Sequence, residues 1–431
     1  MNRNPFTTNP LRRRSVLAAA GTMAAAPLAL AGCGGSEETG DPNKLTFLNQ
    51  SRGQEAVLTA LAAQYSEEQG VEITVDSPGP ADYLPKLQAN AQSGKMPDVY
   101  SSFNATDMAS FYRAGWAKDL TEELDAGWST DFSPAVIELS TFEEGNNLDV
   151  APGIYTVHWE TQTYGFLINP ALAGFTAADA PATTGAFIDA LVNAGGGNFA
   201  VAASLTPQLV QAAASNWLTD DQIAATFNGE DPWEQDAWAG AFQFLVDLKD
   251  AGVIANGALL GGQGDNPEVE TAFFTQSTAA IFDASPGVSV GFKTNPEFED
   301  YFSIGILAAD DGAQPPRSPG VPGKGAVINP KSAAADNALA FVKWLTAPEQ
   351  QTAFATDARI LPANPEILAS DAVPAQLTGF AAGVETIQLM SATFTTDVKT
   401  AIVAESERLV LGESTVDEAL ANIQAAQDRT S

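Results

Sequence analysis

The sequence contains a single cysteine and a single histidine among its 431 residues. One cysteine excludes a disulfide within the monomer, and the pair is too small a set for Cys/His catalysis or a zinc cluster. A Ser-His-Asp triad would have to use His158, which no Gly-x-Ser-x-Gly elbow accompanies. Phosphate-binding and EF-hand loop patterns are also missing, so no cofactor or metal is expected. Chance pairs among the many carboxylates leave an anchored glycosidase as a remote alternative.

Basic residues are scarce as well, with 20 Lys and Arg against 53 Asp and Glu and a formal net charge of −33. Such a surface repels phosphate backbones, which excludes nucleic acid as an expected partner. Cationic solutes such as polyamines fit this charge better than anions do. The length, with 45% hydrophobic residues, predicts two domains or lobes.

The N-terminal 32 residues have the pattern of an export signal. Arg12, Arg13 and Arg14 precede an alanine-rich apolar stretch from Val16 to Ala31, which is too short and too weakly apolar for a stable membrane span. Arg13 and Arg14 resemble a twin-arginine export motif. We therefore expect residues 1–32 to be removed and the mature chain to be exported, with the twin-arginine route as one possibility.

The cysteine ends the stretch Leu30-Ala31-Gly32-Cys33, which resembles a bacterial lipobox. Small residues before Cys33 give a peptidase access to the backbone, and the thiol accepts a diacylglyceryl group. Residues 33–44 are rich in Gly, Ser, Glu and Asp, as expected for a flexible tether. These features predict a lipoprotein on the outer face of the cytoplasmic membrane, typical of a Gram-positive actinobacterium.

Beyond the tether, hydrophobic periodicity predicts a β-α-β unit, with alternating Leu45 and Phe47, a helical face formed by residues 57–65, and alternation again over Val71–Val75. Such a unit implies parallel strands with a right-handed crossover. Further elements are predicted as helices at 81–93, 184–194, 237–249 and 333–345, strands at 98–101 and 164–169, and a loop at 311–325. Thr346 to Glu349 and Ser414 with Asp417 look like capping boxes that begin two more helices.

Four stretches of the sequence together resemble family 1 extracellular solute-binding proteins, which include maltose-binding protein and many actinobacterial sugar receptors. These stretches are Gly94–Val99 followed by Arg113–Trp116, Tyr164–Asn169, Phe274–Phe282, and Gly325–Pro362 with its FVKWLTAPEQQTAFA and ILPANPE segments. The sequence departs from the family pattern at Ile168, where Tyr is usual, and at Ser277, where Gly is usual. The resemblance runs from about Leu45 to Asp428.

The resemblance implies an α/β fold, a two-lobe periplasmic-binding-protein-like clamp in which the chain crosses between lobes more than once. Lobe one is expected at 45–155 plus 319–357, and lobe two at 156–318 plus 358–431. A monomeric receptor of this kind captures a small polar solute, here expected to be a mono- or oligosaccharide, and delivers it to the permease subunits of an ABC importer. A polyamine, a metal chelate or another small solute on the same fold is the alternative.

Candidate solute-binding residues come from loops after predicted strands and from the expected crossover. The set is Arg52, Ser102, Asn104, Asp107, Trp159, Gln162, Tyr164, Asp283, Lys324 and Phe394. Each has a structural alternative: helix capping for Asn104 and Asp107, hinge packing for Trp159 and Tyr164, a plain loop for Lys324, and core packing for Phe394. Asp283 begins a segment where many sugar receptors carry a tryptophan, and Phe394 is the candidate to replace that aromatic. His158 is more typical of a hydrogen-bonded structural histidine.

Overall fold

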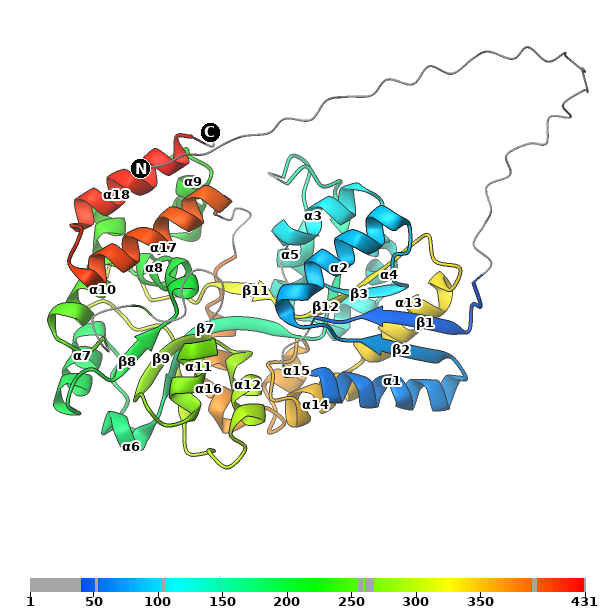
Figure 1. The fold of residues 1–431 in the computed structure, drawn as a ribbon, viewed down its shortest axis with the longest axis horizontal. Coiled ribbons are helices and arrows are strands. Elements are labelled where there is room, and N and C mark those ends of the chain that lie inside the picture. The colour runs from blue at the N-terminus through cyan, green and yellow to red at the C-terminus, as the bar shows by residue number, and fades with distance from the viewer. Residues whose placement is uncertain are drawn as a thin grey trace, which may run out of the picture. The chain divides into compact units, whose positions relative to one another are not determined.

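The computed structural model describes residues 40–50, 53–102, 105–146, 148–254, 259, 267–389 and 394–429. This part of the chain forms two α/β lobes, each built on its own sheet (Figure 1). The predicted two-lobe fold is thereby confirmed. No helix in the described ranges is both long enough and apolar enough to cross a membrane.

The sheet of lobe one has the strand order β2-β1-β3-β12-β6. Its strands are β2 (Glu72–Asp76), β1 (Lys44–Leu48), β3 (Val99–Ser102), β12 (Gly325–Ile328) and β6 (Val157–His158). The predicted β-α-β unit is present: β1 and β2 pair in parallel, and α1 (Glu55–Gln69) connects them. By contrast, β12 runs antiparallel to both β3 and β6. The carboxyl ends of β1, β2 and β3 therefore lie at the same edge as the start of β12.

Helices cover both faces of this sheet because successive strand residues point to opposite sides. Phe47 packs in a core with α1, α13 (Ala335–Leu345) and α14 (Pro348–Asp357). Its neighbour Leu48 packs in a separate core with α2 (Pro80–Ser93) and α3 (Ala105–Arg113). The remaining elements of lobe one are α4 (Thr121–Asp125), the 3-10 turn Trp128–Asp131, α5 (Pro134–Ser140), β4 (Thr141–Phe142) and β5 (Gly153–Ile154).

Lobe two has a sheet in the order β10-β7-β9-β8, and β11 also pairs with β7. Its strands are β10 (Phe302–Ile304), β7 (Thr161–Ile168), β9 (Ala280–Ala284), β8 (Phe199–Val201) and β11 (Gly320–Pro322). Along β7, Phe166 and Ile168 belong to one core and Leu167 to another, so this sheet is also buried on two faces. The segment predicted as a loop at 311–325 was therefore partly wrong, since it contributes β11.

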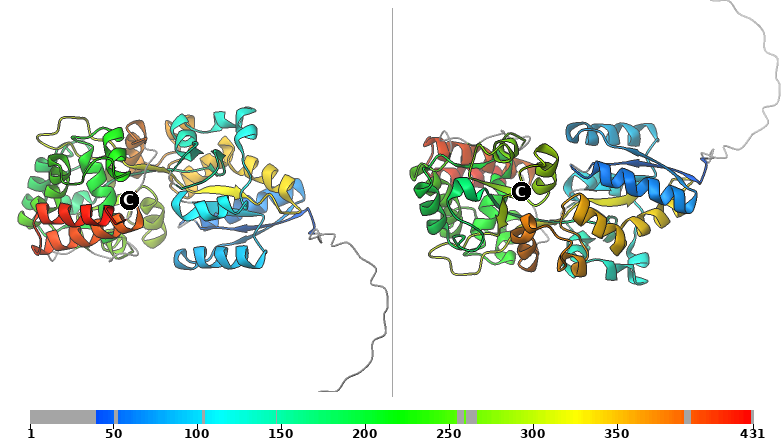
Figure 2. Two further views of the ribbon diagram at one scale, coloured as in Figure 1. Left: turned by 90° about the horizontal axis from the view of Figure 1, so that it is seen from above. Right: turned by 90° about the horizontal axis from the view of Figure 1, so that it is seen from below.

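The sheet face that carries Phe166 and Ile168 packs against the larger set of helices. Figure 2 shows the red and orange C-terminal helices of this lobe beside its green ones. These are α7 (Thr184–Asn193), α8 (Thr206–Ala214), α9 (Asp220–Phe227), α10 (Asp236–Asp250), α17 (Thr396–Leu411) and α18 (Val416–Gln427). On the second face lie α11 (Pro267–Phe274), α12 (Gly287–Thr294) and α16 (Thr378–Glu385). The short elements are α6 (Pro170–Ala173), α15 (Pro365–Leu368) and 3-10 turns at Ala203–Leu205 and Ala375–Leu377.

Three chain segments pass between the lobes, and backbone hydrogen bonds join them into a ribbon. The middle segment is 159–161. On one side Trp159 N–H donates to Lys324 O (3.2 Å) and Gly323 N–H to Glu160 O (2.8 Å); on the other, Thr161 N–H donates to Leu361 O (2.9 Å). We call these paired segments, 159–161, 323–324 and 361–363, the hinge ribbon. Each lies a few residues beyond a predicted lobe boundary.

Candidate functional site

At the edge of lobe one, polar groups gather where the parallel strands end. Gln50 follows β1, and its backbone N–H donates to Ser101 Oγ of β3 at 3.0 Å. Lys324 immediately precedes β12, and its ammonium donates to Gln50 Oε1 at 2.7 Å. The predicted Lys324 is thus brought to the same edge as the β1 loop. In α/β folds this is the edge at which ligands are usually bound.

Ser102, at the end of β3, is buried and takes part in a chain of hydroxyl groups. Its Oγ lies 3.1 Å from Tyr112 OH, which lies 2.7 Å from Thr156 Oγ1. Burial raises the pKa of Tyr112. This network fixes α3 against the end of the sheet. Asp107 is exposed in the first turn of α3, where the helix dipole favours a carboxylate.

On lobe two, Gln162 and Tyr164 lie on the same face of β7, because they are two residues apart. Gln162 Nε2 donates to Tyr164 OH at 3.0 Å, and burial raises the pKa of Tyr164 to about 12. The Tyr164 ring stacks on Phe282 with centroids 6.1 Å apart. Ser318 accepts from the Tyr164 N–H and donates to its carbonyl oxygen. The predicted pair therefore forms a rigid polar corner of lobe two.

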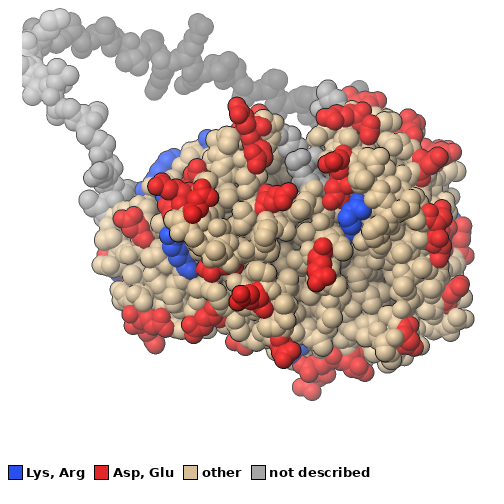
Figure 3. Space-filling model, turned by 180° about the vertical axis from the view of Figure 1, so that it is seen from behind, with Lys and Arg blue, Asp and Glu red and all other residues tan. Residues whose placement is uncertain are grey.

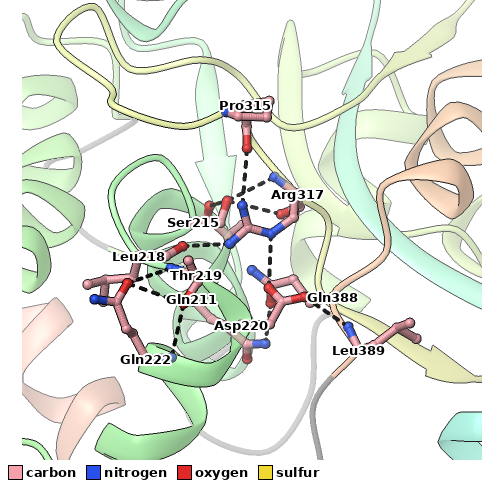
Figure 4. Close-up of polar contacts among 11 residues, drawn as sticks. Gln211, Ser215, Leu218, Thr219, Asp220, Gln222, Pro315, Arg317, Gln388 and Leu389 are labelled. Carbon is pink, nitrogen blue, oxygen red and sulfur yellow. Dashed lines mark hydrogen bonds and ion pairs between the residues drawn. The ribbon is translucent and has the colours of Figure 1, made fainter.

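A polar cluster that the sequence did not reveal includes Gln211, Arg317 and Gln388 (Figure 4). The Gln388 N–H donates to Ser318 O, and Gln211 Nε2 donates to Gln388 Oε1 at 2.6 Å. The side-chain Nε2 of Gln388 is buried and has no hydrogen-bond partner among the described residues. A buried amide donor left in this state costs free energy unless an acceptor reaches it. Gln211 and Gln388 therefore join Gln162 and Tyr164 as candidate site residues.

Arg317 and Asp220 hold this cluster together (Figure 4). Arg317 Nε donates to Asp220 Oδ1 at 2.9 Å, and its Nη2 donates to the carbonyl oxygen of Leu218. The other carboxylate oxygen of Asp220 accepts from the Leu389 N–H at 3.1 Å. Both side chains are mostly buried, with 17% and 23% exposure. The pair thus ties the start of α9 to the segment that follows Gln388.

The predicted site residue Asp283 lies in β9 of lobe two. It is buried near the end of β9, and its Oδ1 accepts from the Ala284 N–H at 2.8 Å. A side chain at Gly287, the first residue of α12, would collide with this carboxylate at 2.1 Å. The structure therefore favours a role for Asp283 in joining β9 to α12.

The two aromatic candidates lie in hydrophobic cores. Trp159 is completely buried in lobe one, where its ring stacks on Phe354 at 5.4 Å and its indole N–H donates to Gln54 Oε1 at 2.9 Å. No face of the indole is open to a solute, so the packing alternative corrects its predicted stacking role. Phe394 is partly buried and contacts Phe227 at a ring-centroid distance of 4.2 Å. Its ring likewise contributes to the core of lobe two.

Cys33, Arg52 and Asn104 lie outside the described residues. His158 is buried in β6, with Nδ1 2.9 Å from Gly323 O, and burial lowers its pKa to about 4. A neutral, hydrogen-bonded histidine in the core matches the structural alternative.

The family model that matches this chain is that of bacterial extracellular solute-binding proteins, and the match spans residues 60–381. Since this is more than half of the chain, the protein belongs to that family, and the resemblance of its motifs is confirmed. Service as the solute-binding component of an ABC transporter fits this membership. None of the curated proteins compared with the chain matches it.

Solved structures show the same fold at low sequence identity. A cyclic alpha-maltosyl-1,6-maltose binding protein from Arthrobacter globiformis is 20% identical, with a TM-score of 0.67 over 90% of this chain and 98% of that one. A probable secreted solute-binding lipoprotein from Streptomyces coelicolor is 19% identical, with a TM-score of 0.71 over 90% and 99%. An ABC transporter solute-binding protein from Thermotoga lettingae, bound with alpha-D-tagatose, is 18% identical, with a TM-score of 0.71 over 89% and 99%.

Proposed function

We propose that this protein captures a mono- or oligosaccharide between the polar edges of its two lobes and delivers it to an ABC permease. The observation that carries this proposal is the presence of two hydrogen-bonding edges, one on each lobe, joined by the hinge ribbon. Lobe one contributes Gln50 and Lys324, and lobe two contributes Gln162, Tyr164 and Gln388. Amide and hydroxyl groups of this kind suit the hydroxyl groups of a sugar. Structural relatives named for sugars support the same solute class.

A bound solute acts by favouring one arrangement of the lobes over another. It shifts that equilibrium only by its differential affinity for the two arrangements. Capture and delivery of the solute by such a receptor require binding and release only, without a chemical step. The permease would recognise the arrangement that the solute stabilises.

A thermal-shift screen against mono- and oligosaccharides, polyamines and metal chelates tests the proposal. At a free concentration of 100 Kd, a saccharide should stabilise the fold by about 2.7 kcal/mol. Gln162→Ala and Gln388→Ala should remove most of this shift, whereas Gln243→Ala, on the exposed surface of α10, should leave it intact. A response to polyamines alone would replace the saccharide by a cationic solute. Turnover of a glycan would contradict the receptor role.

The polyamine alternative has one observation in its favour, the acidity of the surface. Figure 3 shows acidic side chains scattered over one face of the molecule, with few basic ones. The side chains that form the polar corner described above are amides and a hydroxyl, and the Asp220 carboxylate beside them is paired with Arg317. For this reason the saccharide is preferred.

We further propose that the mature chain is anchored to the membrane by a lipid on Cys33. The lipobox and the twin arginines, both read from the sequence, support this assignment. Mass spectrometry of the membrane fraction should find a diacylglyceryl group on an N-terminal Cys33, and Cys33→Ser should release the protein from membranes. Recovery of unmodified wild-type protein from the soluble fraction would contradict the anchor.

A further inference from the structure

Helix α12 of lobe two contacts lobe one through three separate features. Lys293 Nζ lies 3.6 Å from Glu55 Oε2, in the first turn of α1. An added Cβ on Gly53 would lie 2.4 Å from the hydroxyl of Ser289, which marks a close approach of the two backbones. Phe292 lies under the guanidinium of Arg359, 4.0 Å from the ring centroid. The helix thus packs against the α1 and α14 face of lobe one.

Arg359 is the residue that connects this contact to the hinge ribbon. It follows α14 and precedes Leu361, an outer member of the ribbon. Its Nη2 donates to Glu299 Oε1 at 2.6 Å, and only 16% of its side chain is exposed. Its φ of +55° is in the left-handed region that arginine rarely adopts. The backbone is held in an unfavourable conformation that places the guanidinium between Phe292 and Glu299.

These contacts lie on the side of the ribbon away from the candidate site. In lobe one, Ser102 belongs with α3, on the sheet face opposite to α1 and α14. In lobe two, Tyr164 belongs to the core of α8 and α17, on the sheet face opposite to α12. Figure 1 shows α12, α14 and α1 together on one side of β7, with α3 and α17 on the other. A rotation about the ribbon that brings the α3 and α17 faces together therefore separates α12 from Arg359.

We propose that Arg359, Glu299 and Phe292, supported by Lys293 and Glu55, form an ionic latch that stabilises the arrangement in which the solute-binding edges are apart. The pairs lie partly in solvent, so their contribution is modest and depends on salt. The solute must overcome the latch to bring the edges together. Only the predicted effect on solute affinity rests on the proposed function, because the latch itself acts in the solute-free protein.

Fluorescence energy transfer in the solute-free protein tests the latch directly. Dyes are placed on cysteines introduced at Gln88 in α2 and Ala425 in α18, in full-length chains carrying Cys33→Ser. Arg359→Gln and Glu299→Gln should each shift the distribution of dye-to-dye distances toward shorter values. The double variant should show about the same shift as either single variant. Arg359→Lys should restore part of the wild-type distribution. Lys86→Gln, which removes an ion pair confined to lobe one, should leave it unchanged.

Affinity provides the second measurement. Titrated with the saccharide that gives the largest thermal shift, Arg359→Gln and Glu299→Gln should bind about two- to five-fold more tightly than wild type. Unchanged distances in both variants, or weaker binding, would overturn the latch. If no saccharide, polyamine or chelate binds while the distances still shift, the proposed function fails and the latch stands.

Discussion

Gln54 and Glu160 are joined by a hydrogen bond of 2.9 Å between the Gln54 amide Nε2 and Glu160 Oε2, across 106 positions of sequence. The other end of the same amide accepts from the indole N–H of Trp159. Both side chains are completely buried. Gln54 directly precedes α1 and Glu160 is the middle residue of the hinge ribbon, so this amide fixes the start of α1 to the ribbon.

Glu160→Gln should preserve this link and change its pH dependence. Burial raises the pKa of Glu160, and the Lys324 charge and two hydrogen bonds only partly offset that effect. A raised carboxyl pKa contributes stability that is complete below the ordinary value of 4.5 and is lost as pH rises through the raised value. The difference in unfolding free energy between Glu160→Gln and wild type should therefore shift in favour of the variant as pH rises from 4.5 to 8. Urea titrations at a series of pH values measure this difference.

Glu160→Ala is the matched comparison. Gln54 Nε2 and the Lys324 N–H both donate to Oε2, and Oε1 has no partner among the described residues. A glutamine can satisfy both donors with one oxygen, whereas alanine leaves both unsatisfied and should cost about 1–3 kcal/mol. Equal losses in the two variants would show that the carboxylate charge, and not the hydrogen bonds, is what matters.

The contribution of His158 to stability should depend on pH in the opposite direction to that of Glu160. Its pKa falls from 6.5 to about 4 on folding because burial disfavours the imidazolium. The resulting stability is complete above pH 6.5 and is lost as pH falls toward 4, by about 3 kcal/mol in all. His158→Asn, which can still donate to Gly323 O, should flatten the unfolding free energy between pH 4.5 and 7. A wild-type slope retained in this variant would assign the effect to other groups.

Trp159→Ala should destabilise the protein by about 3–5 kcal/mol, because it removes a fully buried indole stacked on Phe354. Trp159→Phe keeps an aromatic ring but leaves Gln54 Oε1 without its donor, so a loss of about 1–3 kcal/mol is expected. Thermal melts without solute measure both. A normal melt combined with lost saccharide binding would instead support direct contact with solute.

Arg317 and Asp220 should show strong coupling in a double-mutant cycle. Removing either partner leaves the other charge partly buried and unpaired. Removing Asp220 also takes away the acceptor of the Leu389 N–H. Arg317→Ala and Asp220→Ala should each cost about 1–3 kcal/mol, and the double variant less than their sum. Denaturant unfolding gives the coupling energy, and the saccharide titration reports whether Gln388 has moved. Additive losses would argue against a direct ion pair.

Local pattern was enough to predict most elements near their observed bounds. The helix expected at 81–93 is α2, that at 184–194 is α7, and that at 237–249 is α10, each within two residues. These segments have strong helical periodicity, and tertiary packing agrees with it. Helix starts were less predictable. The last helix is capped by Thr415 with Glu418, one residue later than expected, and α14 starts after Ala347 with no side-chain cap.

The site was less accessible to sequence reasoning because its contacts are long-range. Lys324, Gln162 and Tyr164 became candidates through their place in a family pattern. Gln211 and Gln388 were missed because 177 positions separate two ordinary glutamines. Trp159 follows a strand and precedes a crossover, which is equally compatible with a surface aromatic and a core one. Only the packing of Phe354 decides between them.

The order of strands in lobe one has a consequence for synthesis of the chain. Strand β12, which lies between β3 and β6, is encoded after every strand of the lobe-two sheet. A nascent chain that has emerged only as far as residue 320 therefore exposes two unsatisfied strand edges, which invite pairing with other chains. Truncations before Gly325 should aggregate, and a chaperone or rapid completion of the chain should reduce aggregation during synthesis.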